Sequence, residues 1–184
     1  FRSRILKEYR TGNRRVREWV AIAANELGLQ PTCEGALDMK LDLTQIIDGF
    51  PGNEHALTAA PLYKDVIQLL AQTRTSYTTT LQISHGGTPA QNFFIERDLP
   101  QNDARLAHFS PPLLAEKKFS RRHWYAPEEY FFGAIAQGAA SVQRAGGLVG
   151  IGSHGEVPGY GIHWEMQAHA AGGMTPHEVL RAAT

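Results

Sequence analysis

The chain has 184 residues, of which 42% are hydrophobic and 20% are charged, and its 18 basic residues balance its 18 acidic residues. This composition is typical of one globular domain, and a net charge of zero argues against nucleic-acid and anionic-membrane partners. The single cysteine, Cys33, excludes an internal disulfide framework and a Cys-x-x-Cys metal site. No apolar stretch approaches the roughly 18 residues that cross a bilayer, so we predict a soluble protein and leave its compartment open.

The first part of the chain alternates strand patterns with helical patterns. Residues 3–9 (SRILKEY) predict a strand ending near Lys7, and residues 29–35 (LQPTCEG) predict another ending near Glu34. Between them, residues 13–28 predict an amphipathic helix that begins at an Asn13 cap and stops at Gly28. Its predicted buried stripe consists of Val16, Trp19, Val20, Ala23, Ala24 and Leu27.

The alternation continues through residue 84. Residues 41–49 predict a short helix, and GNEHA predicts a short strand ending at His55. Residues 61–73 predict a helix opened by Pro61. SYTTTLQIS, rich in β-branched and aromatic residues, predicts a strand that ends at Ser84 and His85. Repeated βα units of this kind indicate an α/β fold with a parallel sheet, either open or closed as a barrel.

The last part begins with an irregular section, residues 86–126, which is polar, interrupted by prolines and long enough to form a lid or an active-site loop. Residues 127–146 then predict a helix with Pro127 at its start and Gly146 after its end. LVGIGSH predicts a strand buried on both sides that delivers His154 to a glycine-rich turn. Thr175, Pro176 and Glu178 form a capping box that predicts a final helix.

Ionisable side chains stand at five successive predicted strand ends. In a parallel α/β fold, the loops at these ends converge on one face, where ligands bind. Each residue alone has an ordinary structural explanation: a histidine satisfied in the fold, a surface lysine or a glutamate that caps a helix. Together they favour a shared metal or polar site made of Lys7, Glu34, His55, His85 and His154. His163 and Trp164 either begin a helix above this site or only pack the junction.

The segments GNEHA, GIGSHG, HWEM and GGMTPHEVLRAAT carry a resemblance to a known family. The chain resembles the C-terminal half of the catalytic domain in the metal-dependent amidohydrolase superfamily, among its imidazolonepropionase-like and prolidase-like enzymes. It looks most like the branch in which this domain follows a β-propeller segment. The similarity runs through nearly all 184 residues, and GGMTPHEVLRAAT is its most specific part.

The resemblance implies a partial (β/α)8 barrel, from strand four to the helices after strand eight, with residues 86–126 as a long loop or lid after strand seven. A complete barrel takes roughly 250 residues. We therefore expect residues 1–184 to be one fragment of such a domain, since the chain begins with Phe1 and stops in LRAAT. The family's strand one, with its His-x-His metal pair, would belong to a missing N-terminal part.

The family's site residues transfer to this chain by position. His55 matches the strand-six histidine ligand, and Lys7 matches a lysine that the family often carboxylates to bridge two metals. Two positions depart from the pattern. Glu34 replaces the usual strand-five histidine, and His154 replaces a strand-eight aspartate that binds metal and takes a proton from water. The implied metal ligands are Lys7, Glu34, His55 and His154, with His154 also catalytic and with His85 and His163 as substrate contacts.

The resemblance implies a hydrolase that cleaves C–N bonds through a metal-activated water. Zinc is the expected metal, with manganese or iron as alternatives and one or two ions per site. The substrate would be a small molecule, a cyclic amide or a short peptide, and residues 1–184 alone are expected to be inactive. The departures at Glu34 and His154 leave one alternative, an inactive relative that binds metal or a small molecule. A second, structural alternative is an incomplete module that works only with its N-terminal half. Oligomeric state, a homo-oligomer included, is left open.

Overall fold

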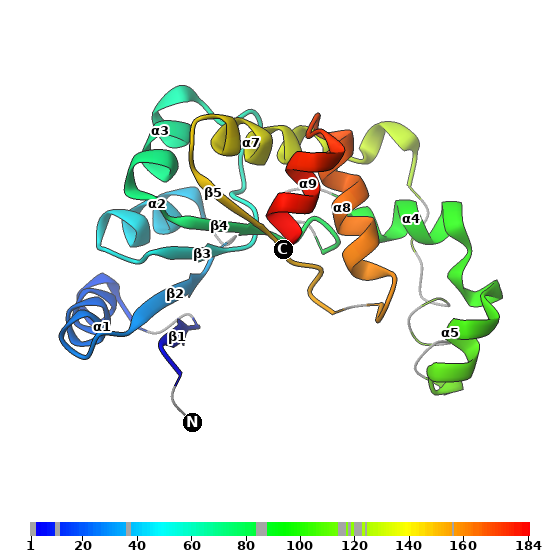
Figure 1. The fold of residues 1–184 in the computed structure, drawn as a ribbon, viewed down its shortest axis with the longest axis horizontal. Helices are drawn as coiled ribbons and strands as arrows, with labels where there is room; N and C mark the ends of the chain where they lie inside the picture. Colours follow the sequence, from blue (N-terminus) through cyan, green and yellow to red (C-terminus); the bar gives the residue numbers. More distant parts are fainter. Residues whose placement is uncertain are drawn as a thin grey trace.

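One parallel sheet organises the protein. The computed structural model describes residues 3–9, 12–35, 38–83, 88–113, 117, 119, 123, 125–155 and 157–184. All strands run parallel, each beside the next along the chain (Figure 1). The five strands are β1 (Ile5–Glu8), β2 (Gln30–Glu34), β3 (Gly52–Glu54), β4 (Ser76–Thr79) and β5 (Leu148–Ile151). The predicted α/β fold with a parallel sheet is therefore confirmed, and the C-terminal ends of all strands lie at one edge.

Helices connect the strands. The first three connections carry α1 (Arg14–Glu26), α2 (Met39–Ile47) and α3 (Lys64–Thr73). The long connection from β4 to β5 holds α4 (Ala90–Asp98), η1 (Pro100–Asn102), α5 (Ala104–Phe109), η2 (Pro127–Glu129) and α7 (Phe132–Arg144). After β5 come α8 (Gly161–Ala171) and α9 (Pro176–Ala183). None of the helices in the described ranges is long and apolar enough to cross a membrane.

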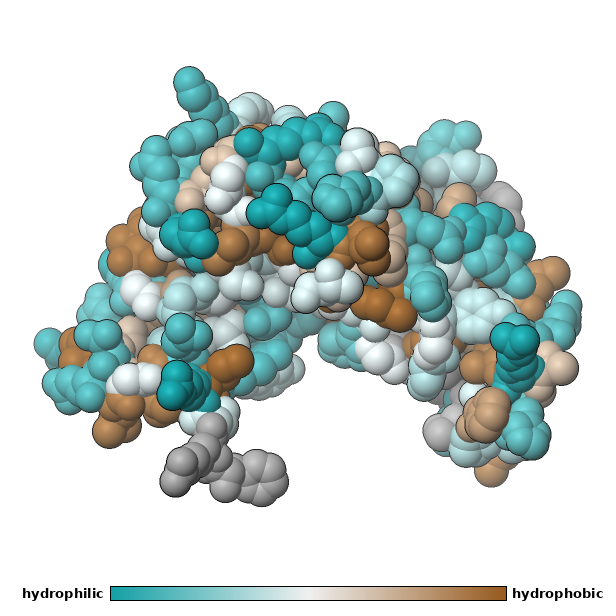
Figure 2. Space-filling view, in the orientation of Figure 1, coloured by the Kyte–Doolittle hydropathy of each residue, from teal (hydrophilic) through white to brown (hydrophobic). Residues whose placement is uncertain are grey.

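The two faces of the sheet differ in polarity because side chains alternate along each strand. On one face, Tyr77 of β4 is buried with side chains of α2, α3, α7 and α9. A second core forms where α4, α7 and α8 meet around Phe94, Phe132 and Trp164. The opposite face carries polar side chains that are exposed or only half-buried, among them Lys7, Thr32, Glu54 and Thr78. Figure 2 shows a wide hollow between the part with α1 and the part with α5.

Two apolar segments are more exposed than predicted. Trp19 of α1 is 60% exposed and Leu27, directly after α1, is 73% exposed, whereas Ala21 packs with Cys33 and Phe50. The predicted stripe was therefore wrong in part, because this helix approaches the sheet through its small residues. The strand LVGIG is also not buried on both sides. β5 lies at an edge of the sheet, with β4 as its paired neighbour among the described residues, and Leu148 is 41% exposed.

Several predicted boundaries were wrong. The helix expected to open at Pro61 begins at Lys64, since Leu62 packs into the core beside Gly138. The helix expected from Pro127 begins at Phe132, because Glu129 caps a separate 3-10 turn by accepting the Ala126 N–H at 2.6 Å. The strand predicted to reach Ser84 ends at Thr79. Ser84 and His85 lie outside the described residues.

The section predicted to be irregular, residues 86–126, contains helices where it is described. α4 forms because Phe94 and Ile95 enter the core. α5 forms behind an N-cap, Asp103, whose carboxylate accepts the backbone N–H groups of Arg105 and Leu106 at 2.7 and 3.2 Å. The aspartate was a usable sequence signal for this helix. The role of the section as a lid stays a prediction.

The capping box of the last helix is confirmed. Thr175 Oγ1 accepts the Glu178 N–H at 3.3 Å, and a Glu178 carboxylate oxygen accepts the Thr175 N–H at 2.7 Å. Pro176 is the first helical residue, where its missing N–H has no cost. Val179 of this helix is buried in the core, so the cap stabilises a helix that packs on the sheet.

We predict that Thr175→Ala lowers the free energy of unfolding by about 1 kcal/mol, because the first turn of α9 loses its acceptor. Urea denaturation followed by circular dichroism measures the change. Ser141→Ala is the matched control, since this exposed hydroxyl only bonds back to Gln137 O within α7. An equal loss in both variants would contradict the capping role.

Candidate functional site

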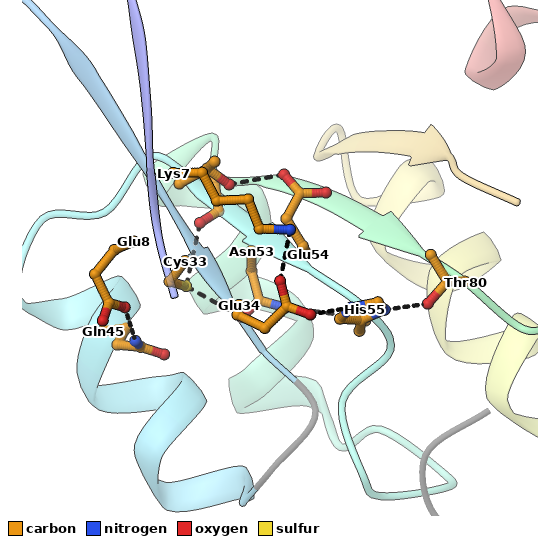
Figure 3. A network of polar contacts seen from close by, with 11 residues as sticks. Lys7, Glu8, Cys33, Glu34, Gln45, Asn53, Glu54, His55 and Thr80 are labelled. Atoms are coloured by element: carbon orange, nitrogen blue, oxygen red, sulfur yellow. Dashed lines mark hydrogen bonds and ion pairs between the residues drawn. The ribbon is translucent and has the colours of Figure 1, made fainter. Parts of the chain in front are cut away.

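Three side chains from neighbouring strands meet in one chain of contacts. Lys7 of β1 places its Nζ 2.5 Å from Glu34 Oε2, at the end of β2. The other oxygen, Glu34 Oε1, lies 2.5 Å from Nε2 of His55, the residue directly after β3. Figure 3 shows the Glu34 carboxylate between the lysine and the histidine. The structure therefore brings together three of the residues predicted from the strand ends.

The second ring nitrogen of His55 has its own partner. Nδ1 contacts the Thr80 hydroxyl, which follows the end of β4 (Figure 3). The backbone of His55 is held as well: its N–H donates to Thr78 O at 2.7 Å, and its carbonyl accepts from Asn53 Nδ2 at 3.1 Å. The His55 side chain is only 5% exposed. Its orientation is thus fixed from both sides of the ring and through the main chain.

His154 reaches the same place from the other edge of the sheet. It lies three residues beyond the end of β5, and its ring centroid is 5.7 Å from that of His55, with the planes inclined at 46°. The residue is exposed, in contrast to His55. The predicted site therefore combines a chain of three polar groups with one accessible imidazole beside it. In this chain Glu34 and His55 are buried, whereas Lys7 is exposed.

The backbone turns sharply at both histidines. His55 has φ of 72° and His154 has φ of 58°, and in the described ranges only Arg74 and Leu99 share this feature among residues other than glycine. A left-handed conformation without glycine costs on the order of 1 kcal/mol and often marks a functional position. At the ends of β3 and β5 the strained turn places an imidazole where a continued strand would not. Sequence patterns carry no signal for this feature.

Electrostatics keep Glu34 ionised. Burial alone would raise the pKa of this carboxyl, but hydrogen bonds from Lys7 and His55 outweigh burial and hold the pKa below its ordinary value. At neutral pH, the group is a carboxylate that accepts from both neighbours. Cys33, on the same strand, is different: burial raises the pKa of its thiol to about 12, so it is neither a thiolate nucleophile nor a thiolate ligand at neutral pH.

The fit of this site to a metal ion is partial. Imidazole and carboxylate are suitable zinc ligands, and His55 and Glu34 provide one donor of each kind. No group of three or more His, Cys, Asp or Glu side chains that could hold a metal is found within the described ranges, and a catalytic zinc site takes three protein ligands. Lys7 is engaged as an ion-pair partner of Glu34. Its carboxylation stays a prediction.

The two predicted substrate contacts have different outcomes. His85 lies outside the described residues. His163 is an exposed residue in the first turn of α8, and within the described part of the chain it makes no hydrogen bond or ring contact with Lys7, Glu34 or His55. Its role in substrate binding stays a prediction.

Sequence reasoning missed the residues that orient the site. Thr80 contacts His55, and Asn53, which is fully buried, holds the His55 carbonyl. Thr32 donates to Glu54 at 2.7 Å on the same sheet face. The run of three threonines after Tyr77 suggested only a strand, and a hydroxyl at a strand end was the one available signal for Thr80.

Comparisons with known proteins show a likeness in structure but none in sequence. No protein-family model matches the sequence, and no curated protein matches it either. The structure is similar to the crystal structure of ochratoxinase from A. niger, with a TM-score of 0.59 and 17% sequence identity. The alignment covers 98% of this chain and 38% of that chain, so this chain spans less than two fifths of its length. At this identity the likeness shows a shared fold alone.

We predict that the protein loses stability in acid through Glu34. A carboxyl whose pKa is lowered on folding stabilises the protein above its ordinary pKa, about 4.5, and this contribution is lost as pH falls through the lower folded value. Glu34→Gln should therefore lower the free energy of unfolding at pH 7 by about 1–3 kcal/mol and flatten its dependence on pH in acid. Denaturant unfolding from pH 3 to pH 7 measures both effects.

Glu18→Gln is the control for this experiment. Its ion pair with Arg14, at 3.2 Å, is exposed, and such pairs contribute less than about 1 kcal/mol. If the two variants had the same pH profile, Glu34 would not be a specially stabilised carboxylate.

Proposed function

We propose that this protein is a hydrolase that acts on C–N bonds of amide or peptide-like substrates. The observation that carries the proposal is the convergence of Lys7, Glu34 and His55 at the ends of three adjacent parallel strands, with the His154 ring beside them. In α/β folds this edge is where catalytic groups collect. The resemblance to metal-dependent amidohydrolases, on segments that contain His55 and His154, gives the reaction class.

We also propose that the sheet is part of an amidohydrolase-type (β/α)8 barrel. Five parallel strands in consecutive order, joined by helices, are the pattern of such a barrel. β1 and β5 each have one paired strand among the described residues, and Ile5 of β1 is 64% exposed. The shared fold with part of a longer enzyme chain, 38% of ochratoxinase, supports the same view. The remaining strands would come from a further N-terminal part of the same chain.

The residues of this chain have separable roles in the proposed reaction. His154 is accessible, and a neutral imidazole can take a proton from water near neutral pH. Glu34 stays ionised and holds His55, which is buried and fixed through both ring nitrogens. If a divalent metal is bound, Glu34 and His55 would hold it, and it would activate water and polarise the substrate carbonyl. Lys7 balances the charge of Glu34.

One observation favours a second function, that of a binding protein without turnover. Lys7, Glu34 and His55 already satisfy one another, and the family's aspartate position holds His154, which lacks a carboxylate's charge. Such a site could bind a metal or a small molecule and do no chemistry. Metal binding without hydrolysis of any substrate would favour this alternative.

The test uses the full-length protein with asparagine substitutions. Asparagine tolerates positive φ, so His55→Asn and His154→Asn remove an imidazole without adding backbone strain. We expect hydrolysis of N-acyl amino acids or dipeptides, in the presence of zinc, to fall at least ~100-fold in either variant. We also expect His55→Asn to weaken zinc binding, measured by calorimetry.

His177→Asn is the matched control, because this exposed histidine lies in the first turn of α9 and does not follow a strand end. It should keep full activity and zinc affinity. Unchanged hydrolysis in both His55→Asn and His154→Asn would refute the proposed function. Tight zinc binding with no turnover by the unmodified protein on any substrate would replace it with the binding alternative.

A further inference from the structure

A second polar cluster lies behind the candidate site, where α8 packs against the end of β4. Glu165 and His169 of α8 are both fully buried. His169 Nδ1 is 2.8 Å from the Glu165 carbonyl oxygen, to which it donates, and its Nε2 is 2.6 Å from Thr79 Oγ1. Burial lowers the pKa of His169, so it is a neutral imidazole that accepts the Thr79 hydroxyl hydrogen. Thr79 is thereby tied to the helix.

Glu165 binds the two backbone groups that follow Thr80. Its Oε1 accepts the Leu81 N–H at 2.7 Å, and its Oε2 accepts the Gln82 N–H at 3.0 Å. These bonds replace strand pairing at the point where β4 stops, and they explain why the predicted strand ends early. Ile83 N–H then closes a turn on Thr80 O at 3.2 Å. The main chain around Thr80 is thus held on both sides, by Thr79 before it and by Glu165 after it.

A carboxyl that is fully buried at this position costs stability. Burial raises the pKa of Glu165 to about 8, against the hydrogen bonds from Leu81 and Gln82 that lower it. An apolar side chain would avoid this cost, but it would leave two buried amide donors without partners. The two oxygens of Glu165 therefore fix a turn whose amide groups could not otherwise be buried.

The turn matters because Thr80 is the partner of His55. Side chains alternate along an extended chain, so Thr79 faces His169 while Thr80 faces the site. The Thr80 hydroxyl holds Nδ1 of His55 by a hydrogen bond, which fixes the orientation of the ring. With the ring in this orientation, Nε2 faces Glu34. We propose that Glu165 is a positioning residue, which fixes the Leu81–Gln82 turn and so holds the Thr80 hydroxyl against His55.

This inference rests on the proposed function only in taking His55 as a site residue. The experiment therefore reads the state of His55 and uses neither metal nor substrate. Histidine ring nitrogens are observed by NMR in the 15N-labelled protein, and His55 is assigned by its loss in His55→Asn. A failure of hydrolysis in the full-length protein would leave this measurement valid.

Three variants form the test. Thr80→Val removes the hydroxyl directly and should shift the His55 Nδ1 resonance. Glu165→Gln keeps the size of the side chain but offers only one acceptor oxygen for two amides, so it should shift the same resonance in the same direction. Tyr160→Phe is the matched control. It removes the 2.5 Å bond between the residue before α8 and Asp103, without touching β4, and should leave His55 unchanged.

The proposal is overturned if the His55 Nδ1 resonance is unchanged in Glu165→Gln, or if it is unchanged in Thr80→Val. If Glu165→Gln fails to fold, amide hydrogen exchange in the unmodified protein decides. If the Leu81 and Gln82 amides are protected as strongly as that of Tyr77 within β4, their hydrogen bonds to Glu165 hold the turn and the proposal is supported. Exchange of these two amides at the rate of an unstructured loop overturns it.

Discussion

The Glu34 carboxylate lies between the Lys7 ammonium and the His55 imidazole, and this pair of contacts links the ends of three neighbouring strands. Parallel pairing in register makes the link possible, since Lys7 lies opposite Thr32 on β2 and Glu34 lies opposite Glu54 on β3. The lowered pKa of Glu34 is the energetic sign of the same arrangement. A charge that is mostly buried must be paired, so the position of each of the three side chains constrains the other two.

The backbone around the site fixes the positions of its side chains. His55 and His154 both leave their strands with positive φ, and the chain after Thr80 is held by the buried carboxyl of Glu165. Backbone strain and a buried carboxyl both cost stability, and both occur where a side chain is held in one orientation. The helix α8 thus does more than cover the sheet, since it holds the strand that carries the partner of His55.

Local patterns predicted the order of strands and helices, because β-branched runs, caps and helical periodicity are local properties. The strand ends near Lys7, Glu34 and His55 were predicted from the same local patterns, and the ionisable residues at these ends indicated a shared site. The early end of β4 could not be predicted, since it depends on Glu165, more than 80 residues further along the chain. The exposure of Trp19 depends on which face of α1 meets the sheet, and amphipathic periodicity alone does not decide this when small residues make the contact.

Glu34 and His55 act as one unit at the strand ends. A double-mutant cycle on unfolding, with Glu34→Gln, His55→Asn and the pair, tests it most directly, because the cycle isolates the energy that the two side chains share. We expect a coupling free energy of about 1 kcal/mol or more at neutral pH, which shrinks in acid as Glu34 is protonated. Additive effects of the two substitutions, with no coupling at either pH, would contradict it.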